Sequence, residues 1–319
     1  MVGPHFSLQY RDGISNVIAT KQNLIVTGSL IARILFQPIE ETSRLYFSKH
    51  LSLSISASNG NPRPETQAVE WLSASVKLLF SLLDFYAYLG LLFITFGPPF
   101  VYSALLILLG SQSPYLHHGP QSTVVQVLRA YCSLLPLLGL NGVIEAFVQS
   151  AANEADLSRL SKLMVAWCAV FISAVAVFSS SWASHLWGIT PEVGMVLATG
   201  INMSCRIGFG WIFANRYLHQ RGSNQSLSLS RFSPSLLALF GFIVAAIVTR
   251  WNEFNSLSFF TEPFLSAREI KSLVVWQRLF HHLSIGLICF FGCFFLTLFT
   301  EWKRLSSIFS TITSRPKAE

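Results

Sequence analysis

Long apolar stretches separated by short polar ones run through most of this chain. A helix that crosses a membrane needs about 20 mostly apolar residues, and about seven stretches meet that requirement. They cover roughly residues 23–43, 71–96, 123–149, 158–180, 191–215, 233–250 and 277–300. This pattern predicts an all-α fold, a polytopic membrane helix bundle.

The segments outside these stretches predict little independent structure. Residues 1–22 are mixed and polar and contain no apolar signal-peptide core. The apolar piece over 98–110 opens with two prolines and is too short to span, so we expect a re-entrant or interfacial segment there. The organisation predicted is an atypical N-terminal segment (1–22), a membrane region (23–305) and a cytosolic tail (306–319).

Composition agrees with a membrane protein. Hydrophobic residues make up 52% of the chain and charged residues only 12%, whereas soluble domains carry about 25% charged residues. The net charge of +7 is not a nucleic-acid footprint, because the basic residues gather in loops. We therefore expect membrane lipid, and no nucleic acid, around this protein.

The basic residues also predict an orientation. Loops 44–70, 150–162 and 216–232, with the tail after Trp302, carry twelve of the 22 Lys and Arg residues, and the loops on the opposite side carry six. The positive-inside rule places the first set and the C-terminus in the cytosol. The Asn224 glycosylation sequon then lies on the cytosolic side and should stay unmodified.

Polar side chains inside apolar stretches are expensive and therefore indicate function by default. Arg33, Gln37, Glu40 and Glu41 interrupt or end the first stretch. In the second stretch Lys77 can reach the membrane surface with its long side chain. Asp84 lies nearer the middle of that stretch and is harder to explain without a partner or a role.

Two further stretches repeat one motif, an amide followed one helical turn later by a charge. Asn141 precedes Glu145 in the third stretch, and Asn202 precedes Arg206 in the fifth. Glu145 and Arg206 either face a common polar cavity, to which Arg33 adds a second positive charge suited to pyrophosphate, or form a buried pair that only holds the bundle together. The residues leave both interpretations open.

The chain lacks the signatures of soluble-type enzymes and of metal or nucleotide sites. It has no phosphate loop, no dinucleotide fingerprint and no zinc-protease motif. The pairs His117-His118 and His281-His282 are poor metal sites, because adjacent residues on a helix point in different directions. The five cysteines lie in apolar runs and read as small buried hydrophobes. We expect no enzyme activity, no metal and no cofactor.

Three of these segments resemble signatures of one family. They are Arg33-Ile-Leu-Phe-Gln-Pro-Ile-Glu-Glu41, Asn141-Gly-Val-Ile-Glu-Ala-Phe147 and Asn202-Met-Ser-Cys-Arg-Ile207. The chain is similar to the eukaryotic Rft family of dolichol-linked oligosaccharide translocation proteins, within the multidrug and oligosaccharidyl-lipid exporter superfamily. One departure is Ile144, which stands where many members have Thr.

The resemblance implies a fold, a place and a substrate. The chain would be the second lobe of a two-lobed transporter with two extra C-terminal helices, in the endoplasmic reticulum membrane. Its partner would be Man5GlcNAc2-PP-dolichol, moved from the cytosolic to the luminal leaflet for N-glycosylation, and a missing N-terminal lobe would be needed for a complete transporter. The implied substrate-binding residues are Arg33, Gln37, Glu40, Glu41, Asn141, Glu145, Asn202 and Arg206.

Two other functions remain open from the sequence. The chain could be an accessory or scaffold protein of the N-glycosylation pathway that moves no lipid itself. It could also be a drug or ion antiporter of the same superfamily, for which proton- or sodium-dependent uptake through Asp84 would be the signature.

Overall fold

The computed structural model describes residues 34, 36–54, 65–110, 113–116, 119–221, 227, 234–257 and 273–313. In this part of the chain all regular structure is helical. The α-helices are α2 (Glu65–Leu109), α3 (Thr123–Ala151), α4 (Glu154–Phe178), α5 (Ser181–Trp187), α6 (Pro191–Gln220), α8 (Leu236–Leu257) and α9 (Leu273–Thr313). Two short 3-10 helices, η1 (Pro114–Leu116) and η2 (Gly119–Gln121), lead into α3, and a further helix over residues 36–54 (segment 36–54) precedes α2.

Six of the described helices are long and apolar enough to cross a membrane. They are α2, α3, α4, α6, α8 and α9, and they match the second to seventh predicted stretches. The protein is therefore an all-α polytopic membrane bundle. The first predicted stretch, 23–43, lies mostly outside the described residues.

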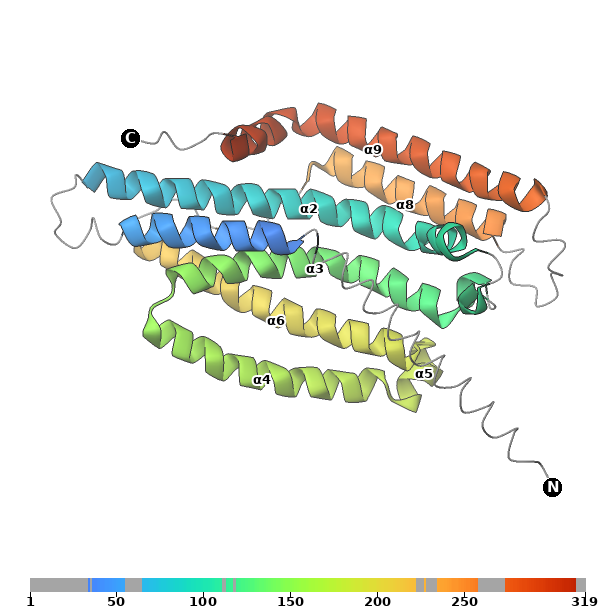
Figure 1. Ribbon diagram of the computed structural model, residues 1–319, viewed down its shortest axis with the longest axis horizontal. Helices are drawn as coiled ribbons and strands as arrows, with labels where there is room; N and C mark the ends of the chain where they lie inside the picture. Colours follow the sequence, from blue (N-terminus) through green and yellow to red (C-terminus); the bar gives the residue numbers. More distant parts are fainter. Residues whose placement is uncertain are drawn as a thin grey trace, which may run out of the picture.

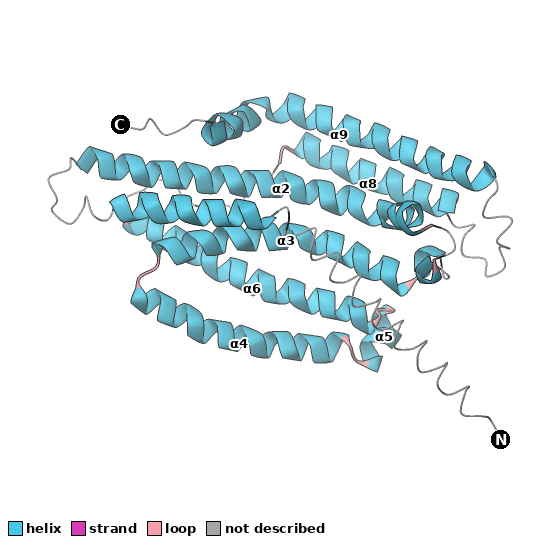
Figure 2. Ribbon diagram, in the orientation of Figure 1, coloured by secondary structure: helices cyan, strands magenta, loops and turns pink. Residues whose placement is uncertain are grey.

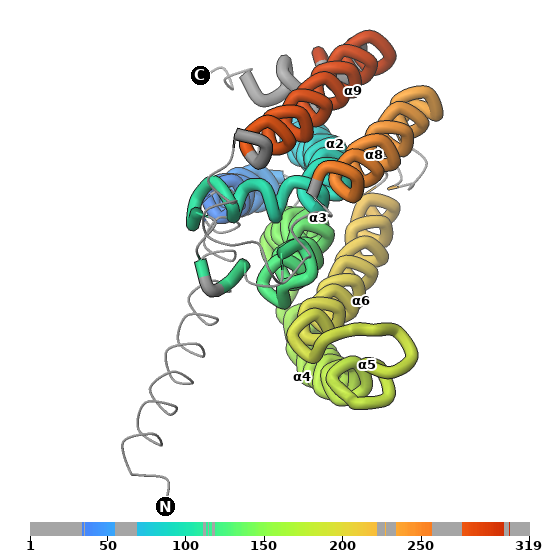
Figure 3. Tube along the Cα trace, turned by 90° about the vertical axis from the view of Figure 1, so that its right-hand side faces the viewer, coloured from blue at the N-terminus to red at the C-terminus, as the bar shows by residue number. Residues whose placement is uncertain are grey.

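The helices pack in three groups (Figures 1 and 2). Helices α2 and α3 form the centre, α6 packs on α3 with α4 on its outer side, and α8 and α9 cover α2. Figure 3 shows the same order from the side, with α9 and α4 at opposite edges. Many large apolar side chains on α4, α8 and α9 are exposed, as expected of surfaces that face lipid rather than water.

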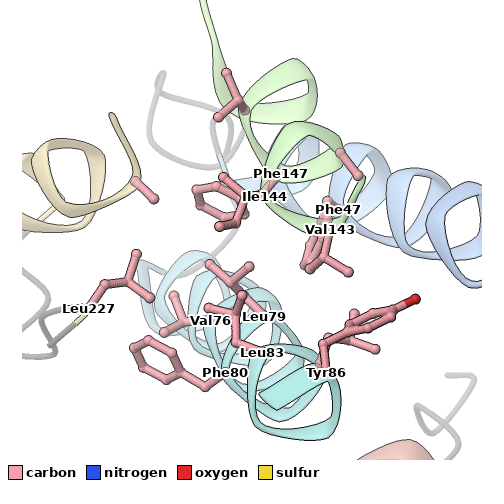
Figure 4. Packing of buried hydrophobic residues seen from close by; sticks show 14 of the residues in the cluster. Phe47, Val76, Leu79, Phe80, Leu83, Tyr86, Val143, Ile144, Phe147 and Leu227 are labelled. Atoms are coloured by element: carbon pink, nitrogen blue, oxygen red, sulfur yellow. The ribbon is translucent and has the colours of Figure 1, made fainter. Parts of the chain in front are cut away.

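The main core joins segment 36–54 to α2, α3 and α6 (Figure 4). Phe47 and Phe147 are fully buried and meet edge to face, with ring centroids 5.5 Å apart. Phe36 meets Tyr86 of α2 in the same way at 5.4 Å. Segment 36–54 is thus an integral element of the bundle.

This segment corrects the expected boundary near Glu41. The sequence predicted a helix end at Gln37–Glu41 and a loop from residue 44, but the helix continues to residue 54. Phe47, His50 and Leu51 repeat on one face and are buried, so packing carries the helix past its polar residues.

The expected separate piece over 98–110 is also corrected. Helix α2 runs continuously to Leu109 with Pro98 and Pro99 inside it. Figures 1 and 3 show that its last part turns across the bundle. A proline lacks the N–H that a helix uses and crowds the preceding turn, so the helix bends rather than ends.

Side chains next to the helix ends bind free backbone N–H groups. Ser122, Asn153 and Ser180 each accept a backbone N–H at the start of α3, α4 and α5. Glu301 has non-helical backbone angles inside α9, and its carboxylate accepts the Ser235 N–H beside the start of α8 at 2.7 Å. Beyond that point α9 continues to Thr313, so the expected tail is partly helical.

Candidate functional site

A cavity of about 430 Å³ lies between segment 36–54, α3 and α6. Its wall combines carboxylates, amides and hydroxyls with apolar side chains. The lining residues are Phe36, Gln37, Glu40, Glu41, Tyr131, Leu134, Leu138, Asn141, Gly142, Thr199 and Met203. The cavity therefore collects most of the polar residues that the sequence singled out, from three different helices.

Gly142 leaves room on α3 for the carboxylate of Glu40 from segment 36–54. A Cβ atom added at Gly142 would lie 2.8 Å from Oε2 of Glu40. Oε1 of the same carboxylate accepts a hydrogen bond from Arg44, one turn further along, at 3.0 Å. The Ser150 hydroxyl also donates to the Arg44 carbonyl across the two helices at 3.3 Å. Glu40 is thus held at the cavity wall.

Glu145 is the centre of a polar network beside the cavity. Its Oε2 pairs with Nη2 of Arg206 at 2.6 Å and accepts from Nδ2 of Asn141 at 3.1 Å. Its Oε1 accepts from Nε2 of Gln149 at 3.1 Å. The side chains of Glu145 and Arg206 are 19% and 26% exposed. The predicted meeting of these two charges is confirmed, and the pair neutralises both.

The Glu145–Arg206 pair lies outside the larger cavity. Arg206 and Glu145 lie in a smaller pocket against Trp167, and neither lines the larger cavity. Asn141, which is 8% exposed, touches both. Of the two arrangements that the sequence left open for Arg206, the structure shows the ion pair with Glu145, beside the larger cavity.

The remaining predicted residues divide into three cases. Gln37 and Glu41 line the cavity with largely exposed side chains. Asn202 is half-buried on α6 and lines neither of these two pockets. Arg33 lies outside the described residues, so its proposed charge next to this site stays a prediction.

Several lining residues were not predicted from the sequence. Thr199 lies four residues before Met203, which belongs to the third motif, so the two share a face of α6. Helical spacing could therefore have predicted that Thr199 lines the same cavity. The same spacing links Glu40 to Arg44 and Glu145 to Gln149. Tyr131 carries no such signal, because only the packing of α3 against its neighbours brings it to the cavity.

The other polar positions lie apart from the cavity. Asp84 is buried in α2, where its side chain has a partner. Lys77 is exposed. All five cysteines are free. Within the described residues no group of three His, Cys, Asp or Glu could hold a metal. The His117-His118 pair and Asn224 lie outside the described residues.

Comparison with known proteins identifies a family. The chain matches the family described as Rft protein over residues 22–311. It is similar to proteins named Man(5)GlcNAc(2)-PP-dolichol translocation protein RFT1. That of Saccharomyces cerevisiae is 33% identical over 60% of this chain and 29% of its own length. That of Mus musculus is 30% identical over 85% of this chain and 43% of its own length. That of Schizosaccharomyces pombe is 33% identical over 77% of this chain and 41% of its own length.

The chain thus spans less than half the length of these relatives. No solved structure matches it. The match to the family begins before the first motif and ends inside the last turn of α9, and it includes every residue that lines the cavity. This chain belongs to the Rft protein family.

Proposed function

We propose that this chain forms one helix bundle of a protein that moves Man5GlcNAc2-PP-dolichol from the cytosolic to the luminal leaflet of the endoplasmic reticulum membrane. The role would be lipid transport for N-glycosylation, without enzymatic catalysis. The observation that carries the proposal is the polar cavity, whose wall includes residues from all three of the family motifs. The names of the relatives support the substrate.

The described charges favour the glycan rather than the pyrophosphate as the group that enters this cavity. Glu41 contributes negative charge, Glu40 presents a carboxylate that is also paired with Arg44, and Arg206 is already paired with Glu145. A pyrophosphate would be repelled by these carboxylates, whereas sugar hydroxyls donate strong charge-assisted hydrogen bonds to them. Gln37 and Thr199 add neutral groups that can bind hydroxyls.

Binding to the chain in lipid nanodiscs tests this directly. The ligands are a Man5GlcNAc2-pyrophosphate lipid with a shortened isoprenoid tail and the same pyrophosphate lipid without sugar. Glu41→Gln keeps the shape but removes the charge, so binding of the glycolipid should weaken about tenfold. Glu154→Gln, at the start of α4 and away from the cavity, is the matched control. Equal affinity for the sugar-free lipid would contradict the assignment.

A cellular and a vesicle assay together separate transport from an accessory role. Yeast depleted of its own RFT1 would express this chain alone or with the N-terminal half of the yeast protein, because the relatives are more than twice as long as the matched region. We expect the chain alone to leave secretory glycoproteins underglycosylated. Purified vesicles with both parts should expose labelled glycolipid to a lectin on the opposite side. Rescue of glycosylation in cells without such movement in vesicles would favour the accessory role.

A further inference from the structure

A second polar cluster lies away from the cavity, where α2 bends, and Arg129 of α3 is at its centre. Nε of Arg129 donates to the Pro98 carbonyl at 3.1 Å and Nη1 to the Pro120 carbonyl at 3.3 Å. Nη2 pairs with Glu253 of α8. Glu253 is 7% exposed and has Arg250 as a second partner at 3.6 Å. One guanidinium therefore joins the bend of α2, the η2 turn and α8.

His282 of α9 holds the next carbonyl of the bend. Its ring is fully buried, and Nε2 lies 3.2 Å from the Pro99 carbonyl oxygen. A carbonyl only accepts, so Nε2 carries the proton, and Nδ1 then accepts from Nδ2 of Asn252 on α8 at 3.0 Å. The ring also stacks on Phe100 at 4.5 Å. Gly286, one turn further on, leaves room for the Phe100 ring.

These contacts fall on the two consecutive prolines that bend the helix. Pro98 and Pro99 remove two backbone donors from α2, so the helix is held less firmly there by its own hydrogen bonds. The side chains that take the Pro98 and Pro99 carbonyls come from α3 and α9, and both are tied to α8. Before the bend, Tyr86 of α2 packs on Phe36 of the cavity wall.

We propose that Arg129 and His282 are positioning residues that set the direction of residues 98–109 of α2 relative to the rest of the bundle. The α8–α9 hairpin holds this clamp in place through Glu253 and Asn252. The hairpin therefore controls the bend of a central helix that reaches the cavity wall. This inference rests on the bend and its contacts alone, and not on the identity of the transported lipid.

Pulsed electron resonance distances in nanodiscs test the proposal. Spin labels replace Leu108, which is 78% exposed on the turned part of α2, and Ile212 on α6, in a background with all five cysteines changed to Ala. Arg129→Lys keeps a charge beside Glu253 but loses the planar fork that reaches two carbonyls. His282→Phe keeps the ring stacked on Phe100 but loses both hydrogen bonds. In both variants the width of the Leu108–Ile212 distance distribution should increase about twofold. The proline bend then lacks a side chain from another helix that binds its free carbonyl.

Two controls distinguish positioning from general stability. His281→Phe changes the exposed neighbour of His282 and should leave the distribution narrow. A label pair at Val165 and Ile212, on α4 and α6, should be unaffected by any of these variants. His282→Gln retains a side-chain donor for the carbonyl and should restore part of the narrow distribution.

The outcomes that overturn the proposal are specific. An unchanged Leu108–Ile212 distribution in both Arg129→Lys and His282→Phe would mean that the prolines alone set the bend. Equal broadening of the Val165–Ile212 pair would mean that the two residues only stabilise the fold. If His281→Phe broadened the distribution as much as His282→Phe, the effect would not come from the contact between His282 and the Pro99 carbonyl.

Discussion

At the scale of single residues, the site depends on two kinds of polar contact. Some join residues one helical turn apart, and others join residues on different helices. Glu145 accepts from Asn141 and Gln149 along α3 and pairs with Arg206 across to α6. The first two contacts follow from i, i+4 spacing, whereas the third needs the two helices to be adjacent. The contact agrees with a structural role for the Glu145–Arg206 pair, which stays a prediction.

Charge reversal tests this pair. Glu145→Arg or Arg206→Glu alone should destabilise the bundle by about 1–3 kcal/mol, because each leaves a partly buried charge without its partner. The double reversal should recover most of that loss. Unfolding in mixed detergent micelles measures the stability of the four proteins, and a double variant as unstable as the two single ones combined would contradict a structural pair.

Two glycines on one helix distinguish folding from binding. A Cβ at Gly139 would lie 2.3 Å from the buried Tyr86 ring, whereas a Cβ at Gly142 meets only the end of the flexible Glu40 side chain. Gly139→Ala should therefore cost about 1–3 kcal/mol of stability through overpacking. Gly142→Ala should leave stability nearly unchanged and weaken glycolipid binding by displacing the Glu40 carboxylate. Loss of stability in Gly142→Ala equal to that in Gly139→Ala would contradict this reading.

At the scale of elements, segment 36–54 shows how packing overrides a local boundary. Its N-terminal half looked like a helix end, with Pro38 and two carboxylates, but its C-terminal half supplies a buried face to the core. The bend of α2 is the reverse case, because Pro98 and Pro99 marked a break that became a turn in a continuous helix. In both elements, contacts with other helices decided what local sequence left ambiguous.

Truncation of Phe47 measures what segment 36–54 contributes. The side chain is fully buried against Phe147, so Phe47→Ala should destabilise the bundle by about 3 kcal/mol through the cavity left behind. Phe299→Ala is the control, because Phe299 is 86% exposed on α9. Equal stability of the two variants in the same detergent titration would show that segment 36–54 is dispensable for the fold.

At the scale of the whole molecule, the loop charges predict one orientation for the bundle. The tail after Trp302 belongs to the basic, cytosolic set, and the loop containing α5 belongs to the opposite side. Asn224 shares the cytosolic set and should carry no glycan.

Cysteine labelling in sealed microsomes tests this topology. In a cysteine-free background, Lys317→Cys should react with an impermeant maleimide applied from the cytosolic side. Trp187→Cys, exposed at the end of α5, should react only after the membrane is opened. The reverse pattern, or a glycan on Asn224, would invert the bundle.

The sequence by itself determined the class of the protein, the places of six of its membrane helices along the chain, and several of the polar positions that line the cavity. It did so because about 20 apolar residues in a row have few alternatives to a spanning helix, and because intramembrane charges are costly enough to be conspicuous. Only the tertiary structure decided that Arg206 pairs with Glu145, that Tyr131 reaches the cavity, and that Arg129 and His282 contact the Pro98 and Pro99 carbonyls at the bend of α2. Those contacts join residues far apart along the chain, and hydropathy or helical spacing within one helix carries no information about which faces of different helices meet.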